Sequence, residues 1–135
     1  MARIDGKTYR FMGQWGESAR AMKQVSLQVL PTRSIYEFEA GGVWMALIFT
    51  SPLLPQDLDV MSRPATYLTW DVRSVDNQTH QVSLYFDCTS EWVVNASNER
   101  VTWGRHKVDD LAVLSFGSQR TTDFAPGRGQ SAARR

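Results

Sequence analysis

Two closely spaced pairs of carboxylates are the first candidates for chemistry, because paired carboxylates perform general acid–base catalysis or bind hard cations. Asp57 and Asp59 are separated by one residue, so an extended backbone would direct both side chains to one face. Prolines surround this pair, and aspartate is a preferred turn residue, so we interpret both as turn-capping residues. Asp109 and Asp110 are adjacent and are interpreted as a simple turn. Neither pair predicts a catalytic site.

The two histidines and the single cysteine also lack the neighbours that catalysis requires. His80 opens a predicted strand just after a turn, and His106 lies between Arg105 and Lys107, whose charges disfavour a protonated imidazole. Cys88 has no base in a local motif and is predicted to be a buried structural thiol. The sequence contains no nucleophile elbow, phosphate-binding glycine loop or HExxH zinc motif. We therefore predict no catalytic residue, no metal site and no cofactor.

Aromatic side chains are the remaining candidates, because exposed rings can stack on sugars or fill a protein interface. Trp44 and Trp70 occur among apolar residues of predicted strands and are interpreted as packing residues. The other aromatics are open to two interpretations, a ligand platform or an interface with a further domain. The interface is favoured, because residues 43–50 also carry surplus apolar surface. The predicted surface consists of Tyr67, Tyr85, Trp92 and Trp103.

The elements that position these side chains are predicted to be β-strands, since apolar and polar residues alternate and turn residues recur at short intervals. This pattern predicts an all-β fold, an antiparallel β-sandwich of roughly 8–10 strands. The predicted strands are residues 7–12, 22–30, 33–39, 43–50, 65–73, 81–87, 91–94, 99–103 and 111–116.

Two of these strands carry specific expectations about burial. Residues 22–30 alternate so that Val25, Leu27 and Val29 share one side, which we expect to be buried. Residues 43–50 are apolar on both sides and are expected to form a central strand covered on both faces.

The connections between strands carry further expectations. Glycines at positions 41 and 42 predict a tight hairpin before residues 43–50. Residues 51–64 contain three prolines and are expected to cross from one sheet to the other. Residues 65–73 and 81–87 are expected to pair as a second hairpin, with Tyr67 and Tyr85 on its outer face.

Length and composition limit the number of domains and the possible partners. The 135 residues suit one domain, with residues 1–117 forming the sandwich and residues 118–135 a disordered or aberrant basic tail. The formal net charge of +1 argues against nucleic acid as a partner. No apolar run approaches the roughly 20 residues that span a bilayer, so a membrane is not expected as a partner either.

Several long stretches of the sequence are specific enough to indicate a family. They are residues 4–13 (IDGKTYRFMG), 30–42 (LPTRSIYEFEAGG), 49–70 (FTSPLLPQDLDVMSRPATYLTW), 82–87 (VSLYFD), 101–103 (VTW) and 107–111 (KVDDL). These stretches resemble the N-terminal region of the glutaminase A family. The resemblance runs from about residue 4 to residue 118 and is expected to end there.

The resemblance implies a β-sandwich that precedes a helical α/α-toroid domain in large secreted L-glutamine amidohydrolases. The toroid is expected to carry the chemistry and to be the partner of this chain, so no catalytic residue is carried over. The parent protein is expected to be extracellular or periplasmic, whereas residues 1–5 do not read as a signal peptide. We therefore expect the chain to come from a partial gene, with a truncated or frame-shifted end.

Together, these observations favour a non-catalytic accessory domain that packs against and shapes the toroid domain of its parent. The alternative is a carbohydrate-binding module that uses the exposed aromatics as stacking platforms. Autonomous hydrolysis is disfavoured, because no acid, base and nucleophile can be assembled from the sequence.

Overall fold

The computed structural model describes residues 1–13 and 19–119, and the chain divides into two compact units, Met1–Phe86 and Asp87–Arg135. The described residues contain ten strands and very little helix. All strand pairs are antiparallel except β2 with β3. The predicted all-β fold with antiparallel sheets is therefore confirmed.

The larger sheet of the first unit has the strand order β4-β5-β6-β7. These strands are β4 (Lys23–Leu30), β5 (Arg33–Ala40), β6 (Val43–Thr50) and β7 (Tyr67–Ser74). The predicted hairpin between β5 and β6 is confirmed, because Gly41 and Gly42 adopt φ angles of 55° and 77°, which disfavour residues with a Cβ atom. β6 is a central strand, as expected. Ala46 is buried on its second face, whereas Trp44 and Ile48 are only half-buried there.

The smaller sheet of the first unit has the order β3-β2-β1-β8. Its strands are β1 (Ala2–Ile4), β2 (Lys7–Arg10), β3 (Arg20–Ala21) and β8 (Val82–Leu84). The sequence did not predict β1 and β3, because two or three residues are too few to show an alternating pattern.

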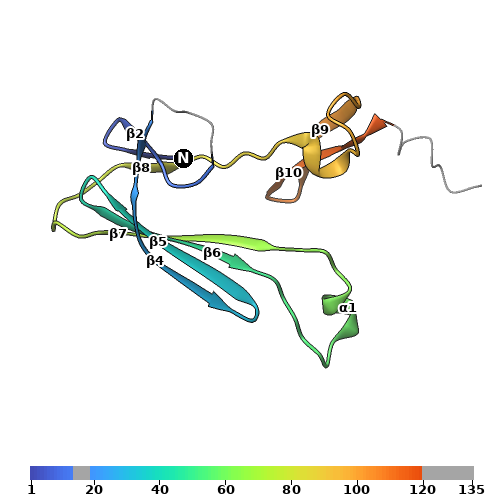
Figure 1. Ribbon diagram of the computed structural model, residues 1–135, viewed down its shortest axis with the longest axis horizontal. Helices are drawn as coiled ribbons and strands as arrows, with labels where there is room; N and C mark the ends of the chain where they lie inside the picture. Colours follow the sequence, from blue (N-terminus) through green and yellow to red (C-terminus); the bar gives the residue numbers. More distant parts are fainter. Residues whose placement is uncertain (14–18, 120–135) are drawn as a thin grey trace, which may run out of the picture. The chain divides into compact units, whose positions relative to one another are not determined.

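The hydrophobic core of this unit lies between the two sheets and near one end of the larger sheet. Figure 1 shows β2 and β8 over the end that holds the β5–β6 turn, with α1 (Leu58–Met61) beyond the opposite end. The small sheet is short, so it covers only part of the large one. The buried apolar residues that form this core are Ala2, Ile4, Tyr9, Met22, Phe38, Val43, Met45 and Leu47.

The prediction that one side of β4 is buried was wrong. Val25, Leu27 and Val29 are all exposed, and Val29 retains 73% of its accessible surface. β4 is an edge strand, and its register shifts between Gln24 and Ser26. Its second half also pairs with β5 at the end of the sheet that is remote from the core. Alternation therefore marks the strand correctly, but the described strands of the small sheet do not cover this end.

The expected crossover at residues 51–64 was also wrong. This segment joins β6 to β7, which are antiparallel neighbours in one sheet, with Thr50 opposite Tyr67. It is a long loop that contains α1, whose residues are not buried. The prolines correctly excluded a strand, but they do not determine which sheet the chain enters next.

The expected hairpin between residues 65–73 and 81–87 does not form. β7 pairs with β6, whereas β8 pairs with β1 in the other sheet, with Ile4 opposite Val82. The chain therefore changes sheets after β7 and not before it. The alternation within β7 is confirmed, since Leu68, Trp70 and Val72 are half-buried and the residues between them are exposed.

The second unit is built around one hairpin. It contains the 3-10 helix η1 (Ser90–Val93) and the strands β9 (Val101–Val108) and β10 (Leu111–Ser118). The predicted strand at residues 91–94 was wrong, because these residues mostly lie in η1, next to β10. The division into a domain of residues 1–117 and a tail stays a prediction. Residues 120–135 lie outside the described part of the chain.

Candidate functional site

Three of the four paired carboxylates have the structural roles that the sequence predicted. Asp57 caps the N-terminus of α1, and its Oδ1 accepts a hydrogen bond of 3.0 Å from the backbone N–H of Val60. Asp109 and Asp110 form the turn between β9 and β10, with Asp109 at a φ of 50°. The prediction that Asp59 caps a turn was wrong, because Asp59 lies within the short helix that Asp57 caps.

Cys88 is exposed, so its prediction as a buried thiol was wrong. β8 ends at Leu84, and the chain beyond it leaves the sheet instead of burying its side chains. Among the described residues, no group of three or more histidine, cysteine, aspartate or glutamate side chains could hold a metal ion. Within the same part of the chain, no helix is long and apolar enough to span a membrane.

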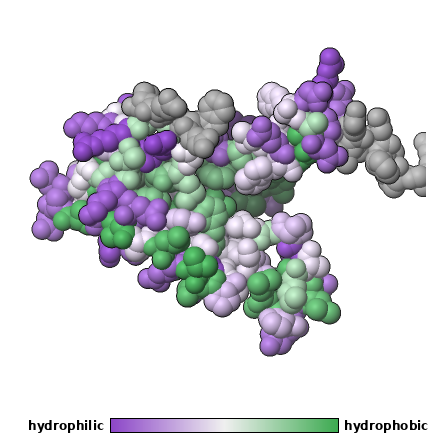
Figure 2. Space-filling model, in the orientation of Figure 1, coloured by the Kyte–Doolittle hydropathy of each residue, from purple (hydrophilic) through white to green (hydrophobic). Residues whose placement is uncertain are grey.

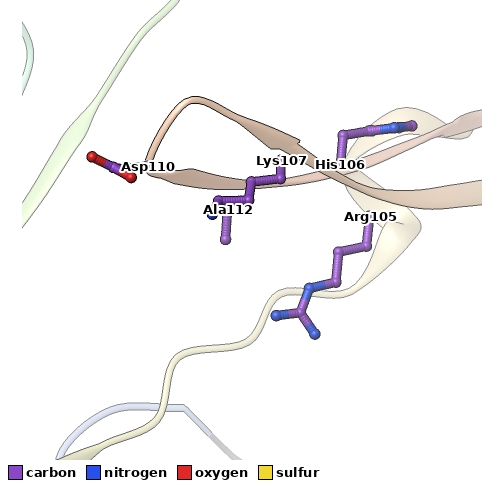
Figure 3. Close-up of a pocket in the computed structure, with 5 residues that line it drawn as sticks. All are labelled: Arg105, His106, Lys107, Asp110 and Ala112. Carbon is purple, nitrogen blue, oxygen red and sulfur yellow. The ribbon is translucent and has the colours of Figure 1, made fainter.

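A shallow depression of about 450 Å³ lies at the tip of the β9–β10 hairpin. Figure 3 shows its lining residues, and the side chains of Arg105 and His106 extend to opposite sides of β9. His106 Nε2 lies 3.2 Å from the hydroxyl of Ser115 on the neighbouring strand.

The four predicted surface aromatics are all exposed. Tyr67 is 62% exposed and lies in β7 of the large sheet, whereas Tyr85 is 57% exposed and lies outside the strands of the small sheet. Tyr85 follows the end of β8, and its backbone N–H donates to the carbonyl of Met1. Trp92 is 76% exposed and Trp103 81%, and both belong to the second unit. Whether they contact a ligand or another domain stays a prediction.

The β9–β10 hairpin carries apolar side chains on both of its faces. Strand register places Trp103 opposite Phe116 and Arg105 opposite Leu114, so these four residues share one face. Trp103, Leu114 and Phe116 on this face, together called the hairpin patch, are all exposed. The opposite face carries Val108, Leu111 and Val113, which are also exposed.

Further exposed apolar residues lie at the end of the large sheet remote from the core. We call this group of residues the free end and define it by Val29, Leu53, Leu54, Leu58 and Tyr67, all of which are exposed. The register puts Val29 and Tyr67 on opposite faces of the sheet. Figure 2 shows hydrophobic residues at the molecular surface around α1. Of these residues, the sequence predicted only Tyr67 to lie on an exposed surface. The prolines and aspartates around the leucines made residues 51–64 resemble a polar loop.

The packing roles predicted for two tryptophans agree with the structure. Trp70 is half-buried, and its ring meets that of Phe86 edge-on with a centroid separation of 6.3 Å. The guanidinium of Arg73 lies 3.9 Å above the centre of the Trp44 ring, a cation–π contact on the outer face of the large sheet.

One cluster of ionisable side chains was missed by the sequence analysis. His80 Nδ1 lies 2.6 Å from Asp5 Oδ2, and its Nε2 lies 2.9 Å from Asp76 Oδ1. The hydrogen bonds to the two carboxylates raise the pKa of His80 above its ordinary value. The hydrogen bond from His80, followed by the backbone hydrogen bonds, lowers the pKa of Asp5 and of Asp76. No local signal could identify this cluster, because Asp5 and His80 are 75 residues apart in the sequence.

Comparison with known proteins supports the resemblance found in the sequence. A family model described as a domain of unknown function (DUF5127) matches residues 32–132. Glutaminase A of Aspergillus oryzae (strain ATCC 42149 / RIB 40) is 32% identical over 109 residues, which cover 80% of this chain and 16% of that relative. No solved structure matches the chain.

The match to the family model continues past Ser118, where the resemblance was expected to end, so that expectation was wrong. The chain spans 16% of the length of the curated relative, and the remaining length of that relative has no counterpart in this sequence. Because the family model covers most of the chain, the protein belongs to the DUF5127 family and is related to the N-terminal region of the glutaminase A family.

Proposed function

We propose that this chain is a non-catalytic accessory module that packs against another domain of a glutaminase A-type protein. The observation that carries the proposal is the β9–β10 hairpin, which exposes apolar side chains on both faces. A two-stranded hairpin is at best marginally stable in water without a covering layer. Exposed apolar patches of this kind are typical of surfaces that bind another protein.

The leucines of the free end are a second group of exposed apolar residues. Leu53, Leu54 and Leu58 lie in the loop between β6 and β7. No residue of α1 in this loop is buried, so the loop adds little to the core. A loop with solvent-exposed leucines is best explained by contact with a further domain. The family resemblance suggests that this domain is the helical toroid of an extracellular or periplasmic amidohydrolase, whose cleft the module would shape.

This proposal predicts that the isolated chain self-associates through its hairpin patch. We expect the wild-type protein to bind a hydrophobic dye and to self-associate in light-scattering measurements. Replacing both Trp103 and Leu114 by serine should weaken self-association by about 2 kcal/mol, roughly 30-fold, because interface aromatics and their apolar neighbours contribute energies of this size.

The matched control is Lys107→Gln, which changes an exposed residue on the same face of the hairpin without removing apolar surface. It should leave dye binding and self-association at the wild-type level at moderate salt. A monomeric wild-type protein that binds no dye would contradict the proposal.

Carbohydrate binding is the alternative proposal, and the nearly complete exposure of the Trp92 and Trp103 rings supports it. A glycan array probed with the labelled full chain separates the two proposals. Under the interface proposal, no glycan binds saturably. Saturable binding that is lost in Trp103→Ala or Tyr67→Ala would favour the carbohydrate-binding module instead.

A further inference from the structure

The cluster of Asp5, His80 and Asp76 has a geometry that requires a particular protonation state. The two ring nitrogens of an imidazole point in different directions, and in His80 each of them meets a carboxylate oxygen, at 2.6 and 2.9 Å. An ionised carboxylate only accepts hydrogen bonds. A neutral imidazole has one N–H, so one of its two contacts would place a lone pair against a negatively charged oxygen. Only the imidazolium donates to both carboxylates.

The carboxylates are held in place by donors other than His80. Asp5 Oδ1 accepts the backbone N–H of Gln81 at 2.9 Å. Asp76 Oδ1 accepts the backbone N–H of Gln78 and the hydroxyl of Ser74, each at 3.0 Å. Each carboxylate therefore accepts hydrogen bonds from donors other than His80, and these donors help to orient it.

The cluster joins both sheets of the first unit at one end. Asp5 lies in the β1–β2 turn of the small sheet, and Asp76 follows β7 of the large sheet. His80 lies just before β8, and the uncharged Gly42 of the β5–β6 turn completes the surroundings. Within residues 1–13 and 19–119, Asp5 and Asp76 are the charged groups that face the imidazole, whose side chain is only 10% exposed.

We propose that Asp5, His80 and Asp76 form a proton-operated latch between the two sheets. With His80 protonated, both hydrogen bonds are made and the turns of the two sheets are tied together. When His80 loses its proton, one of the two bonds loses its donor and the latch is weakened. The latch should therefore stabilise the module most in mildly acidic solution. This property does not depend on the proposed interface.

The pH range of the latch follows from its three groups. Because folding raises the pKa of His80, its contribution is complete below the ordinary value of 6.5 and is lost as the pH rises through the folded pKa. Because folding lowers the pKa of both aspartates, their contribution is present above 3.8 and is lost as the pH falls through the folded values. The latch therefore contributes most between pH 3.8 and 6.5.

The direct test is an NMR titration of the imidazole signals in the full wild-type chain. The sequence contains two histidines, so His106→Gln assigns the signals and His106 serves as an internal reference. We expect His80 to titrate above 6.5, with protons on both ring nitrogens below its midpoint. A midpoint at or below 6.5, or a single protonated nitrogen in acidic solution, would overturn the proposal.

Two substitutions of aspartate test whether the carboxylates are the cause. Asp5→Asn should lower the midpoint of His80, whereas Asp71→Asn, at an exposed carboxylate of β7, should leave it unchanged. An unchanged midpoint in Asp5→Asn would also overturn the proposal. This readout reports a protonation equilibrium, so it is distinct from any change in self-association.

Thermal unfolding of the full chain supplies the second measurement. The melting temperature of the wild type should fall more steeply than that of His80→Gln between about pH 5.5 and pH 8.5, because only the wild type loses a donor in this range. Parallel profiles for the two proteins would contradict the latch. If His80→Gln does not fold, the wild-type titration decides the question alone.

Discussion

Replacing Phe38 by alanine is expected to lower the free energy of unfolding by about 3–5 kcal/mol, the usual cost of removing a buried phenylalanine ring. Phe38 is 2% exposed and lies at the centre of the core between the two sheets. Its ring centroid is 5.9 Å from that of Phe11 and 6.4 Å from that of Tyr36. Because small domains are stable by only about 5–15 kcal/mol, a large share of the protein's stability should be lost. Urea unfolding followed by circular dichroism measures the change.

The matched control is Val29→Ala in β4. Val29 is an alternating apolar residue that the sequence alone would place in the core, yet it is exposed. Its replacement should change the stability by no more than about 0.5 kcal/mol, as for other surface substitutions. The register puts Val29 and Phe38 on the same face of the large sheet, so a large loss in Val29→Ala with a small one in Phe38→Ala would mean that the core lies at the other end of that face.

Replacing Gly42 by alanine should produce the second largest effect, about 2–3 kcal/mol of destabilisation, as expected for a strained backbone position with no room for a methyl group. Gly42 has a φ of 77°, which L-residues rarely adopt. An added Cβ atom would also overlap the carboxylate of Asp76 and lie 2.8 Å from His80 Nε2. The substitution therefore strains the turn and disturbs the latch. Equilibrium unfolding measures this loss.

Gly6→Ala is the control that separates backbone strain from lack of space. Gly6 has a φ of 81°, but an added Cβ atom there would meet nothing within 4 Å. Its replacement should cost only the backbone term of about 1–2 kcal/mol. Equal losses in the two variants would show that the neighbourhood of Asp76 and His80 adds nothing to the cost.

The local pattern of the sequence predicted the longer strands and the turns after β5 and β9. Alternation located β4, β5 and β7, because side chains of a strand point to opposite faces with a period of two. β6 was located by a run that is apolar on both sides. The glycines at positions 41 and 42 predicted their hairpin, because only glycine adopts positive φ angles readily. The capping role of Asp57 followed from the hydrogen bond that its short side chain makes to a nearby backbone N–H. Each of these features depends on residues a few positions apart.

The interface remains a prediction from composition and exposure. The sequence correctly indicated that the aromatics at positions 67, 85, 92 and 103 lie on the surface. It placed Tyr67 and Tyr85 on neighbouring strands, whereas the structure places Tyr67 in β7 of the large sheet and Tyr85 after the end of β8 in the small sheet. The apolar residues of the free end went unnoticed, because an irregular segment has no period that reveals its exposed side.

The sequence by itself determined the all-β class, the family relationship and the hairpin at Gly41 and Gly42, since all of these depend on local conformation or on residue identity. Only the tertiary structure decided that β8 pairs with β1, that β4 stays uncovered and that His80 meets two carboxylates. The physical reason is that strand pairing and ionic clusters join residues far apart in the chain. Their energies depend on which layers pack together, and a period of two residues carries no information about that choice.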